Sequence, residues 1–466
     1  MNILCFDIAS GGITAAILDS QLHVTRSTET PWAAVGKVYD RATLPVPSII
    51  EQFKASITQL QLTPADHIGA ICIDSFMHNC VLLDAEDEPL TPLFTWLDQR
   101  GADGVELIRS ELGDRFHQTT GCRFHPMFPV FKLASMRLEK APALQAAKRI
   151  VSIKALLMHK LTGVWLEDHG IASASGLFNI LKRRWSEEIL DLLGLNAGYL
   201  PEVASRNQIA GGITGSAAAE FGLPPETPVV NGTGDGFAAN VGSACESLDK
   251  LSVTLGTSAV VRQTLAQPAL VAGAGTFCYM ADENAYLLGC AGSNGGNVLD
   301  WGRNILGATD QRVGTDLPIF IPLLHGERSP EWDPDLTGSW HGLKASHTAA
   351  DLSRSILEGV IFNLAHFLEI VQTASATRAA DLVLSGNGFL DPLAAPLLAA
   401  IPGTPVWMPE QPGFLTIRGA AICALRALGE PVPELRLRRI PPLDDAKILQ
   451  RYAEYRRFRG TLPREK

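Results

Sequence analysis

The chain opens on Asn2-Ile-Leu-Cys-Phe-Asp-Ile-Ala-Ser-Gly-Gly-Ile-Thr-Ala-Ala-Ile-Leu-Asp19, two apolar runs joined by small residues. Apolar runs on both sides of a turn rich in Gly and Ser predict a β-hairpin. Such a turn can present backbone N–H groups and hydroxyls to one point, which suits a phosphate. Asp7 ends the first run, where its carboxylate could either cap the turn or hold a hydrated Mg²⁺ beside phosphates.

The same pattern returns past the middle of the chain as Lys250-Leu-Ser-Val-Thr-Leu-Gly-Thr-Ser-Ala-Val-Val-Arg262. Two copies of one hairpin predict two related halves, residues 1–244 and 245–466. Between and after the hairpins, strand patterns alternate with helical ones, such as the apolar steps of four from Thr348 to Gln372. This alternation predicts an α/β fold. The second small-residue turn, Gly256-Thr-Ser258, could hold a triphosphate together with the first.

Size and composition indicate a compact protein of two or three domains. The chain has 466 residues, of which 46% are hydrophobic and 19% charged, enough for a large core. The net charge of −10 argues against nucleic acid as the main partner, because no basic excess neutralises phosphates. No basic and apolar leader and no uninterrupted apolar stretch of about 18 residues occur, which predicts a cytoplasmic protein without a membrane span. The eight cysteines form no Cys-x-x-Cys pair and predict buried core thiols. The charged tail from Arg436 onward predicts a surface helix and a fraying end.

A second acidic turn lies near the boundary of the halves, in Val229-Val-Asn-Gly-Thr-Gly-Asp-Gly-Phe-Ala-Ala-Asn240. Its apolar start predicts a buried strand, and its glycines let the backbone approach a ligand. A carboxylate at Asp235 is well placed to take a proton from a bound hydroxyl group. Glycine-flanked aspartates are also common in ordinary turns, so this stretch alone leaves both interpretations open.

Two further segments follow predicted strands and carry polar or aromatic side chains. Met77-His78-Asn79 follows one strand, although a lone histidine more often serves the structure. In Trp96-Leu-Asp-Gln-Arg100 an extended backbone would place Trp, Asp and Arg on one face, as a surface for a polyol. A core Trp beside a surface ion pair explains the same pattern equally well. No P-loop, Gly-x-Ser-x-Gly elbow or His-Glu-x-x-His helix occurs in the sequence.

The order of the motifs resembles that of the FGGY carbohydrate kinases, members of the actin, hexokinase and Hsp70 ATPase fold group. The motifs run along nearly the whole chain: the loop at Asp7, Met77-His78, Trp96-x-Asp98-x-Arg100, Thr120-Gly-Cys-x-x-His-Pro-Met127 leading to Lys132, Ala172-Ser-Ala-Ser-Gly-Leu-Phe178, Gly234-Asp-Gly236, Gly256-Thr257, Gly295-Gly296 before Trp301, Gly326-Glu-Arg328 and the Gly386 turn. The resemblance implies two ribonuclease-H-like domains of the actin/hexokinase type flanking a central cleft. The domain of residues 1–244 would bind sugar and carry the catalytic Asp, and that of residues 245–466 would bind nucleotide.

The resemblance also implies the reaction, which is transfer of a phosphoryl group from Mg²⁺-ATP to a hydroxyl group of a carbohydrate. Asp235 would be the catalytic base and would touch the substrate, and Asp7 would lie at the metal. The other substrate-binding residues would be Met77, His78, Trp96, Asp98, Arg100 and Met127. The nucleotide-binding residues would be Ser10, Gly11, Gly256, Thr257, Gly296, Asp300, Gly386, Asn387 and Asp391.

The substrate is predicted less sharply than the reaction. The Thr120–Met127 motif and Ser175-Gly-Leu-Phe-Asn179 resemble those of gluconate kinases, whereas Met77-His78 is shared with xylulose kinases. Gluconate would need a cation for its carboxylate, and the candidates are Arg100, Arg123, Lys132 and Lys154. D-xylulose or another ketose or polyol is the alternative substrate. A homodimer is compatible with the sequence, which is otherwise silent on assembly.

The first loop departs from the family pattern and keeps a different class of function open. Ala9 stands at a usual glycine, Gly11 at a usual threonine and Thr14 where a cation is common. These changes remove phosphate donors, so a catalytically impaired sugar-binding or regulatory protein is the alternative from another class.

Overall fold

The structure is a computed structural model that describes residues 1–32, 42–307, 313–314 and 316–460. These residues form two compact units. Unit 1 comprises Met1–Gly242, Cys278–Tyr286 and Phe414–Glu434, and unit 2 comprises Ser243–Phe277, Leu287–Gly413 and Leu435–Lys466. The chain therefore returns twice to unit 1 after residue 244, and a single boundary between residues 244 and 245 stays a prediction.

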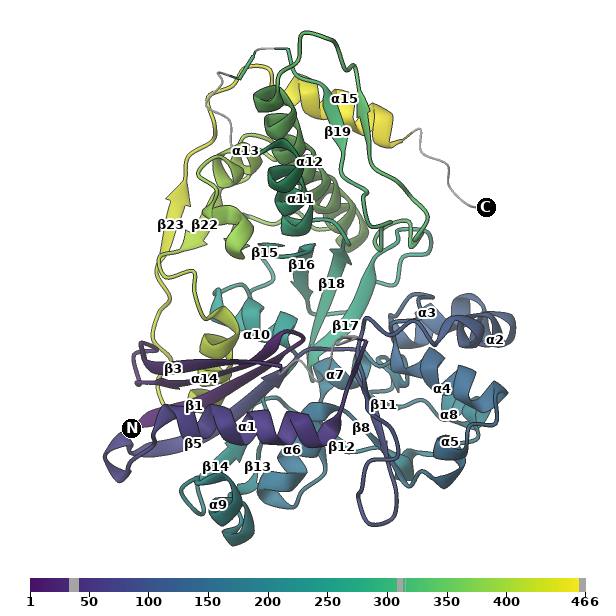
Figure 1. Ribbon diagram of the computed structural model, residues 1–466, viewed down its shortest axis with the longest axis vertical. Coiled ribbons are helices and arrows are strands. Elements are labelled where there is room, and N and C mark those ends of the chain that lie inside the picture. Colours follow the sequence, from purple (N-terminus) through teal and green to yellow (C-terminus); the bar gives the residue numbers. More distant parts are fainter. Residues whose placement is uncertain (33–41, 308–312, 315, 461–466) are drawn as a thin grey trace. The chain divides into compact units, whose positions relative to one another are not determined.

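Unit 1 is built on a six-stranded sheet with the order β13-β14-β5-β1-β2-β3 (Figure 1). The hairpin predicted at the N-terminus is confirmed as its antiparallel centre, and three neighbouring strands, β1, β5 and β14, run parallel. The strands are β1 (Asn2–Ala9), β2 (Gly12–Leu18), β3 (Val24–Pro31), β5 (Ile68–Ser75), β13 (Ile209–Gly212) and β14 (Pro228–Val230).

Side-chain alternation along β1 gives the sheet of unit 1 two different faces. Phe6 and its even-numbered neighbours join the main apolar cluster with Phe53 of α1 (Val46–Leu60) and with α6 (Ile153–Thr162). On β1 and β5 the opposite face packs against α14 (Leu415–Ala427). This helix also crosses α10 (Asp235–Gly242) closely, because a Cβ on Gly419 would lie 2.0 Å from the Ala238 carbonyl oxygen. Asp7, at an odd position of β1, therefore faces the α14 side.

The second sheet repeats the plan of the first, in the order β17-β18-β16-β15-β21-β22-β23. Here too an antiparallel hairpin, β15 with β16, is followed by parallel strands, and β22 then pairs antiparallel with β23. The repeated hairpin predicted from the sequence is therefore confirmed, and the division into residues 1–244 and 245–466 stays a prediction. The strands are β15 (Lys250–Leu255), β16 (Ala259–Leu265), β17 (Phe277–Asp282), β18 (Ala285–Ala291), β21 (Asp381–Ser385), β22 (Val406–Pro409) and β23 (Leu437–Ile440).

Among the described residues, the α-helices of unit 2 are α11 (Gly296–Leu306), α12 (Ala349–Ser375), α13 (Ala394–Ala399) and α15 (Ile448–Arg459). The predicted long helix is α12, and Thr348 caps it by accepting a hydrogen bond from the Asp351 N–H. By length and composition α12 could cross a membrane, but 72% of its most apolar window is buried inside the protein. We therefore describe it as a core helix.

The prediction for the C-terminal tail was confirmed in part, because the tail contains the helix α15 but also a strand. Residues from Leu437 form β23, which pairs with β22. Helix α15 then buries Tyr452 and Tyr455, and the Tyr455 hydroxyl donates to the Asn363 side chain of α12. Apolar side chains spaced three apart among charges were enough to anchor this helix, although its composition is polar. Residues 461–466, where the fraying end was expected, lie outside the described residues.

The remaining elements are short and lie between the main ones. In unit 1 they are β4 (Thr43–Leu44), β6 (Val81–Leu83), β7 (Leu93–Phe94), β8 (Arg149–Val151), β9 (Leu166–Asp168), β10 (Phe178–Asn179), β11 (Arg184–Trp185), β12 (Glu202–Ala204), α2 (Ala102–Leu112), α3 (Asp114–Thr120), α4 (Pro129–Leu138), α5 (Pro142–Ala146), α7 (His169–Ser173), α8 (Glu187–Leu193) and α9 (Gly215–Phe221). In unit 2 they are β19 (Ile319–Ile321) and β20 (Ser339–His341). All eight cysteines are buried free thiols, as predicted.

Candidate active site

Carboxylates stand at the ends of all three parallel strands of unit 1. Asp7 of β1 and Asp74 of β5 are direct partners in the parallel register. Beyond β14 the chain makes a four-residue loop, in which Gly234 bridges to Ser75, and Asp235 then begins α10. Because the carboxyl ends of parallel strands meet at one edge of a sheet, residues 67 to 228 positions apart in the sequence gather there. Asp74 was not predicted as a site residue. Like Asp7, it follows an apolar run directly, and this pattern could have identified it.

One carboxylate oxygen of Asp7 accepts a hydrogen bond from the described residues, and the other does not. The Thr416 hydroxyl of α14 donates to Asp7 Oδ2 over 2.6 Å, whereas Oδ1 is buried with no hydrogen-bond partner among the described residues. Burial raises the pKa of Asp7 to about 7; the Thr416 bond opposes this rise and the Asp235 charge adds to it. Mg²⁺ commonly takes one or two carboxylates together with phosphate oxygens and water. The unpaired oxygen of Asp7 fits such an ion.

The shifted pKa of Asp7 predicts that Asp7→Asn stabilises the metal-free protein at pH 8. The folded protein holds this proton up to about pH 7, whereas the unfolded chain loses it near 3.8. Ionisation of Asp7 therefore lowers the free energy of unfolding as the pH rises through this window. Because the side chain is only partly buried, we expect a gain of about 1 kcal/mol in Asp7→Asn at pH 8, measured by urea unfolding with EDTA present.

Asp19 at the other end of the same hairpin provides a control of opposite sign. Bonds from the backbone and side chain of His23 and from the Gln21 N–H lower the pKa of Asp19 against the opposing effect of burial. Asp19→Asn should therefore be neutral or destabilising at pH 8. A loss of stability in Asp7→Asn at pH 8, or an equal gain at pH 4, would contradict the assignment.

Asp235 is half-buried at the first position of α10, where a helix dipole stabilises negative charge. Its Oδ1 accepts a hydrogen bond from the Gly236 N–H over 2.6 Å. Two glycines shape the loop before it. Gly232 has φ 64°, and a Cβ there would lie 2.1 Å from the Ile73 carbonyl oxygen. A Cβ on Gly234 would lie 2.8 Å from Met77, so this predicted substrate residue packs against the loop that carries Asp235.

His78 and Met127, two predicted substrate-binding residues, are both buried in the protein. His78 is 9% exposed, its Nδ1 lies 2.7 Å from the Ala174 carbonyl oxygen, and its ring meets the edges of Phe128 and Tyr279. Because a carbonyl oxygen only accepts, Nδ1 carries a proton and donates it to this contact. Met127 is 2% exposed. Their roles at a substrate stay predictions.

The premise of an extended backbone at Trp96–Arg100 was wrong. After β7 the chain turns, and the Asp98 N–H donates to the Thr95 carbonyl. Asp98 is buried and accepts two hydrogen bonds from Arg100, whose guanidinium also lies 3.9 Å from the Phe94 ring centre. Trp96 packs partly buried against the main core cluster. Trp96, Asp98 and Arg100 therefore do not share one face, and the Asp98 carboxylate pairs with Arg100.

Two of the four candidate cations for a substrate carboxylate are engaged elsewhere. Lys132 is fully buried and donates to the carbonyls of Thr95 and Met127, which ties the Trp96 turn to the Met127 loop. Lys154 is also fully buried and pairs with Glu167 and Asp168. The remaining candidates are Arg100, whose side chain is 42% exposed, and the half-buried Arg123.

The predicted nucleotide residues of unit 2 converge on the second hairpin turn. The Gly296 N–H at the start of α11 donates to the Gly256 carbonyl over 2.7 Å, and the next N–H donates to the Thr257 carbonyl. Gly386 has φ 95°, and a Cβ there would lie 2.4 Å from the Leu255 carbonyl oxygen. Three glycine-rich segments thus meet beside the N-terminus of an eleven-residue helix, and its first two N–H groups hold the hairpin turn in place.

A hollow of about 270 Å³ lies along the same helix in unit 2. Asp391 is one of its lining residues, together with Leu299, Gly302, Arg303, Val313, Ala350, Ser353, Arg354, Ile356, Leu357 and Leu393. Its largely apolar wall and few polar groups are typical of a site for a planar ring. Two predicted residues lie elsewhere: Asp300 is exposed and pairs with Arg303, and Asn387 is exposed at the start of a 3₁₀ turn.

At the tip of the first hairpin, Ser10 and Gly11 form the two-residue turn between β1 and β2. Around a Cβ built on Gly11, no described atom lies within 4 Å, so the turn leaves its backbone open to a ligand. The structure brings together Asp7 and Asp235 in unit 1, and Gly256, Thr257, Gly296 and Gly386 in unit 2.

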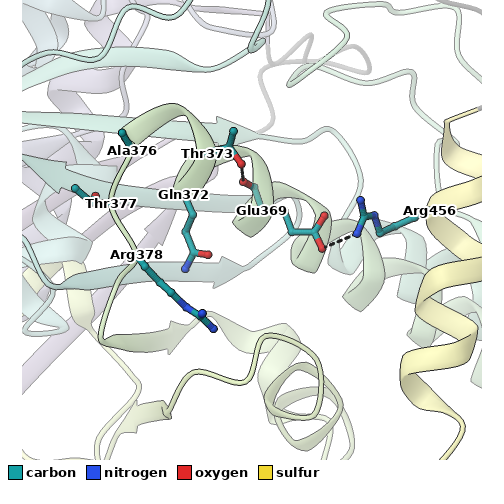
Figure 2. A pocket seen from close by; sticks show the side chains of 7 residues that line it. All are labelled: Glu369, Gln372, Thr373, Ala376, Thr377, Arg378 and Arg456. Carbon is teal, nitrogen blue, oxygen red and sulfur yellow. Dashed lines mark hydrogen bonds and ion pairs between the residues drawn. The ribbon is translucent and has the colours of Figure 1, made fainter.

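A larger hollow of about 530 Å³ is a surface feature that contains none of the predicted residues (Figure 2). It is lined by Glu369, Gln372, Thr373, Ala376, Thr377, Arg378 and Arg456. Its charged groups are already engaged, since Arg456 pairs with Glu369 and Arg378 donates to the Pro402 carbonyl. We assign no chemistry to it.

Comparison with known families gives two matches that follow one another along the chain. Residues 2–242 match the N-terminal domain of the FGGY family of carbohydrate kinases, and residues 251–428 match its C-terminal domain.

Among curated proteins, a gluconokinase from Bacillus subtilis (strain 168) is 33% identical over 323 residues, or 65% of this chain and 63% of the gluconokinase. The chain thus spans less than two thirds of that relative's length. A xylulose kinase from Escherichia coli (strain K12) is 28% identical over 85% of this chain and 84% of its own length. Solved structures include a gluconate kinase and a ligand-bound xylulose kinase, both from Lactobacillus acidophilus. Each has a TM-score of 0.91 at 25% identity, covering 99% of this chain and 98% of its own.

Proposed function

Because the chain belongs to the FGGY family of carbohydrate kinases, we propose that it transfers the γ-phosphoryl group of ATP to a hydroxyl group of a sugar, sugar acid or polyol. The observation that carries the proposal is the placement of Asp235 at the head of α10, with Asp7 close enough for the two charges to interact. Phosphoryl transfer depends mostly on positioning and on charge stabilisation. A base for the attacking hydroxyl and a carboxylate for the metal supply two of the parts that it requires.

Each group has a separate part in the proposed reaction. Asp235 accepts the proton of the substrate hydroxyl as that oxygen attacks the γ-phosphorus, and the Gly236 N–H orients the Asp235 carboxylate. The bond from the γ-phosphorus to the β–γ bridging oxygen breaks, and ADP leaves. Asp7 would hold Mg²⁺, which neutralises charge on the phosphate oxygens when bound. The N–H groups of the Ser10–Gly11 turn and the N–H of Thr257 would bind phosphate oxygens, and the hollow beside α11 would take the adenosine.

Gluconate is the substrate that we favour, and D-xylulose is the second candidate. The gluconokinase relatives and the solved gluconate kinase support the first, and the xylulose kinases among the relatives support the second. A carboxylate substrate needs a cation that is not already buried in an ion pair. Lys132 and Lys154 are both fully buried and held by other groups, one by backbone carbonyls and the other by carboxylates. We therefore propose that Arg100 or Arg123 binds the gluconate carboxylate.

An ADP-formation assay over gluconate, xylulose, ribulose and glycerol, with Mg²⁺-ATP and with other phosphate donors, tests the proposal. We expect turnover with one substrate well above the rate without carbohydrate, and gluconate above xylulose. Because Gly11 and Thr14 stand where the family carries a hydroxyl group and a cation, the KM for ATP is expected to be high. Tight carbohydrate binding without ADP formation under all conditions would support a sugar-binding regulator instead. A cytoplasmic location and independence from nucleic acid and membranes are part of the proposal, and a homodimer stays a prediction.

A further inference from the structure

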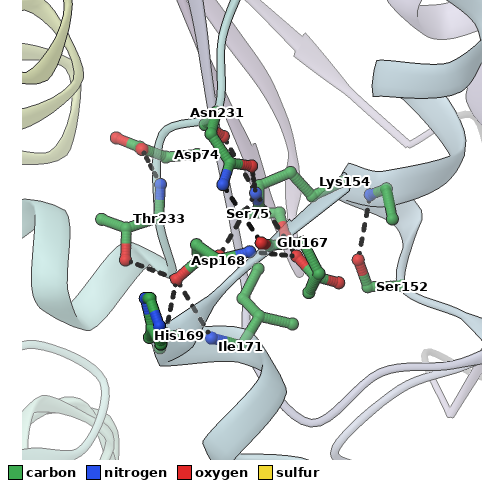
Figure 3. A network of polar contacts seen from close by, with 12 residues as sticks. Asp74, Ser75, Ser152, Lys154, Glu167, Asp168, His169, Ile171, Asn231 and Thr233 are labelled. Atoms are coloured by element: carbon green, nitrogen blue, oxygen red, sulfur yellow. Dashed lines mark hydrogen bonds and ion pairs between the residues drawn. The ribbon is translucent and has the colours of Figure 1, made fainter. Parts of the chain in front are cut away.

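A fully buried cluster of charged and polar side chains includes two residues of the loop that leads to Asp235 (Figure 3). We call it the Lys154 cluster, and its members are Lys154, Glu167, Asp168, Asn231 and Thr233. Each member is at most 2% exposed. Lys154 comes from α6, the two acids from the end of β9, and the last two from the loop between β14 and α10.

Lys154 is the centre of the cluster. Its ammonium lies 3.3 Å from Glu167 Oε1 and 3.2 Å from Asp168 Oδ2, and it donates to both the carbonyl and the side-chain oxygen of Asn231. Four oxygen atoms therefore surround one buried cation. Although burial opposes it, the two carboxylates raise the pKa of Lys154, so the group is an ammonium ion in the folded protein.

Thr233 connects the cluster to the sheet. Its hydroxyl donates to Asp168 Oδ1 over 2.8 Å, and its N–H donates to Asp74 Oδ1 over 3.0 Å. Its carbonyl accepts from the Ser75 N–H. Asp168 Oδ1 also accepts from the Gly170 and Ile171 N–H groups, so it caps α7 and holds the loop at the same time.

Asn231 holds the other end of the loop. Its amide group donates to the carbonyls of Glu167, Ala204 and Ser205, while its oxygens accept from Lys154. The backbone N–H groups of Asn231 and Gly232 donate to the carbonyls of Gln208 and Arg206. Every backbone N–H from Asn231 to Thr233 thus has a fixed partner, only two residues before Asp235.

We propose that the Lys154 cluster is a positioning device for Asp235, in which Lys154 and Asp168 fix Thr233 and thereby the place of the Asp235 carboxylate. The proposal rests on the proposed function, because it needs Asp235 to be the base. None of the cluster residues is exposed to a substrate, so each is a positioning residue. A satisfied buried network makes a site rigid, and errors of about 1 Å in a reacting group can cost about 100-fold in rate.

Thr233→Val tests the proposal with little risk to the fold. The change removes one hydroxyl, keeps the N–H bond to Asp74 and leaves Asp168 Oδ1 with two other donors. We expect kcat to fall about 10- to 100-fold, while the KM values for carbohydrate and ATP stay within about threefold. Thr233→Ser keeps the hydroxyl and should restore kcat to within about threefold.

Thr227→Val is the matched control, since Thr227 is also buried, lies just before β14 and donates its hydroxyl to the Pro224 carbonyl. It should lose similar stability but no turnover. If kcat falls equally in Thr227→Val and Thr233→Val, the loss is general and the proposal is overturned.

A double variant separates positioning from a general effect on the protein. If Thr233 acts only through Asp235, then adding Thr233→Val to Asp235→Asn should change kcat by less than about twofold. An unchanged kcat in Thr233→Val alone, or an equal fall in both backgrounds, overturns the positioning role while leaving the kinase assignment intact. Full activity in Asp235→Asn would instead overturn the proposed base itself.

Discussion

Asp235→Asn is expected to lower kcat by about 10²- to 10⁴-fold, the usual contribution of a general base. Asparagine has nearly the same size, and its side-chain oxygen can still accept the Gly236 N–H, but it cannot take up the proton of the attacking hydroxyl. The loss should therefore fall on kcat and on kcat/KM to a similar degree. Steady-state kinetics with the best substrate from the carbohydrate panel measure both values.

The control for this variant is a measurement of whether it still folds. Because Asp235 is half-buried at a helix N-terminus, Asp235→Asn should keep the melting temperature within a few degrees, and it should still bind carbohydrate. A variant that folds and retains the wild-type rate would show that the proton goes to another group. A variant that unfolds would show that Asp235 supports the structure, which its position does not predict.

Lys154→Met is expected to lower the free energy of unfolding by about 3–5 kcal/mol, the usual cost of removing one partner of a buried ion pair. The change leaves Glu167 and Asp168 buried without a cation and removes both bonds to Asn231. Burial already raises the pKa of Glu167 to about 7 while Lys154 opposes the rise. Losing the ammonium should therefore force at least one acid to take up a proton. Urea unfolding at pH 8 measures the loss.

Lys132→Met is the control, because Lys132 is equally buried but its ammonium is held by two backbone carbonyls. Burial lowers the pKa of Lys132 to about 8. Removing the Lys132 ammonium breaks no buried ion pair among the described residues. Lys132→Met should therefore lower the free energy of unfolding clearly less than Lys154→Met does. Equal losses in the two variants would show that the cost comes from lost side-chain volume rather than from unpaired charge.

The parts of the fold that the sequence predicted were those specified locally. Small-residue turns between apolar runs identified both hairpins, and apolar steps of four identified α12. Asp7 and Asp235 were found because each follows a strand pattern and lies next to glycine or other small residues. The same local signals also located the glycine-rich segments that meet at Gly256.

What the sequence did not predict depends on contacts between distant segments. Thr416 reaches Asp7 from 409 residues away, and no local pattern marks it. The Trp96–Arg100 alternation looked like one face of a strand, but the pairing of Asp98 with Arg100 stabilises a turn. Residue type alone could not show that Lys132 and Lys154 are buried, since lysine is usually exposed.

The most direct test of the central claim is the mass of the carbohydrate after incubation with the protein and Mg²⁺-ATP. We expect gluconate to gain one phosphoryl group in step with ADP formation, and Asp235→Asn to suppress both. No phosphorylated product from gluconate, xylulose or any other carbohydrate of the panel, despite measurable binding, would contradict the claim.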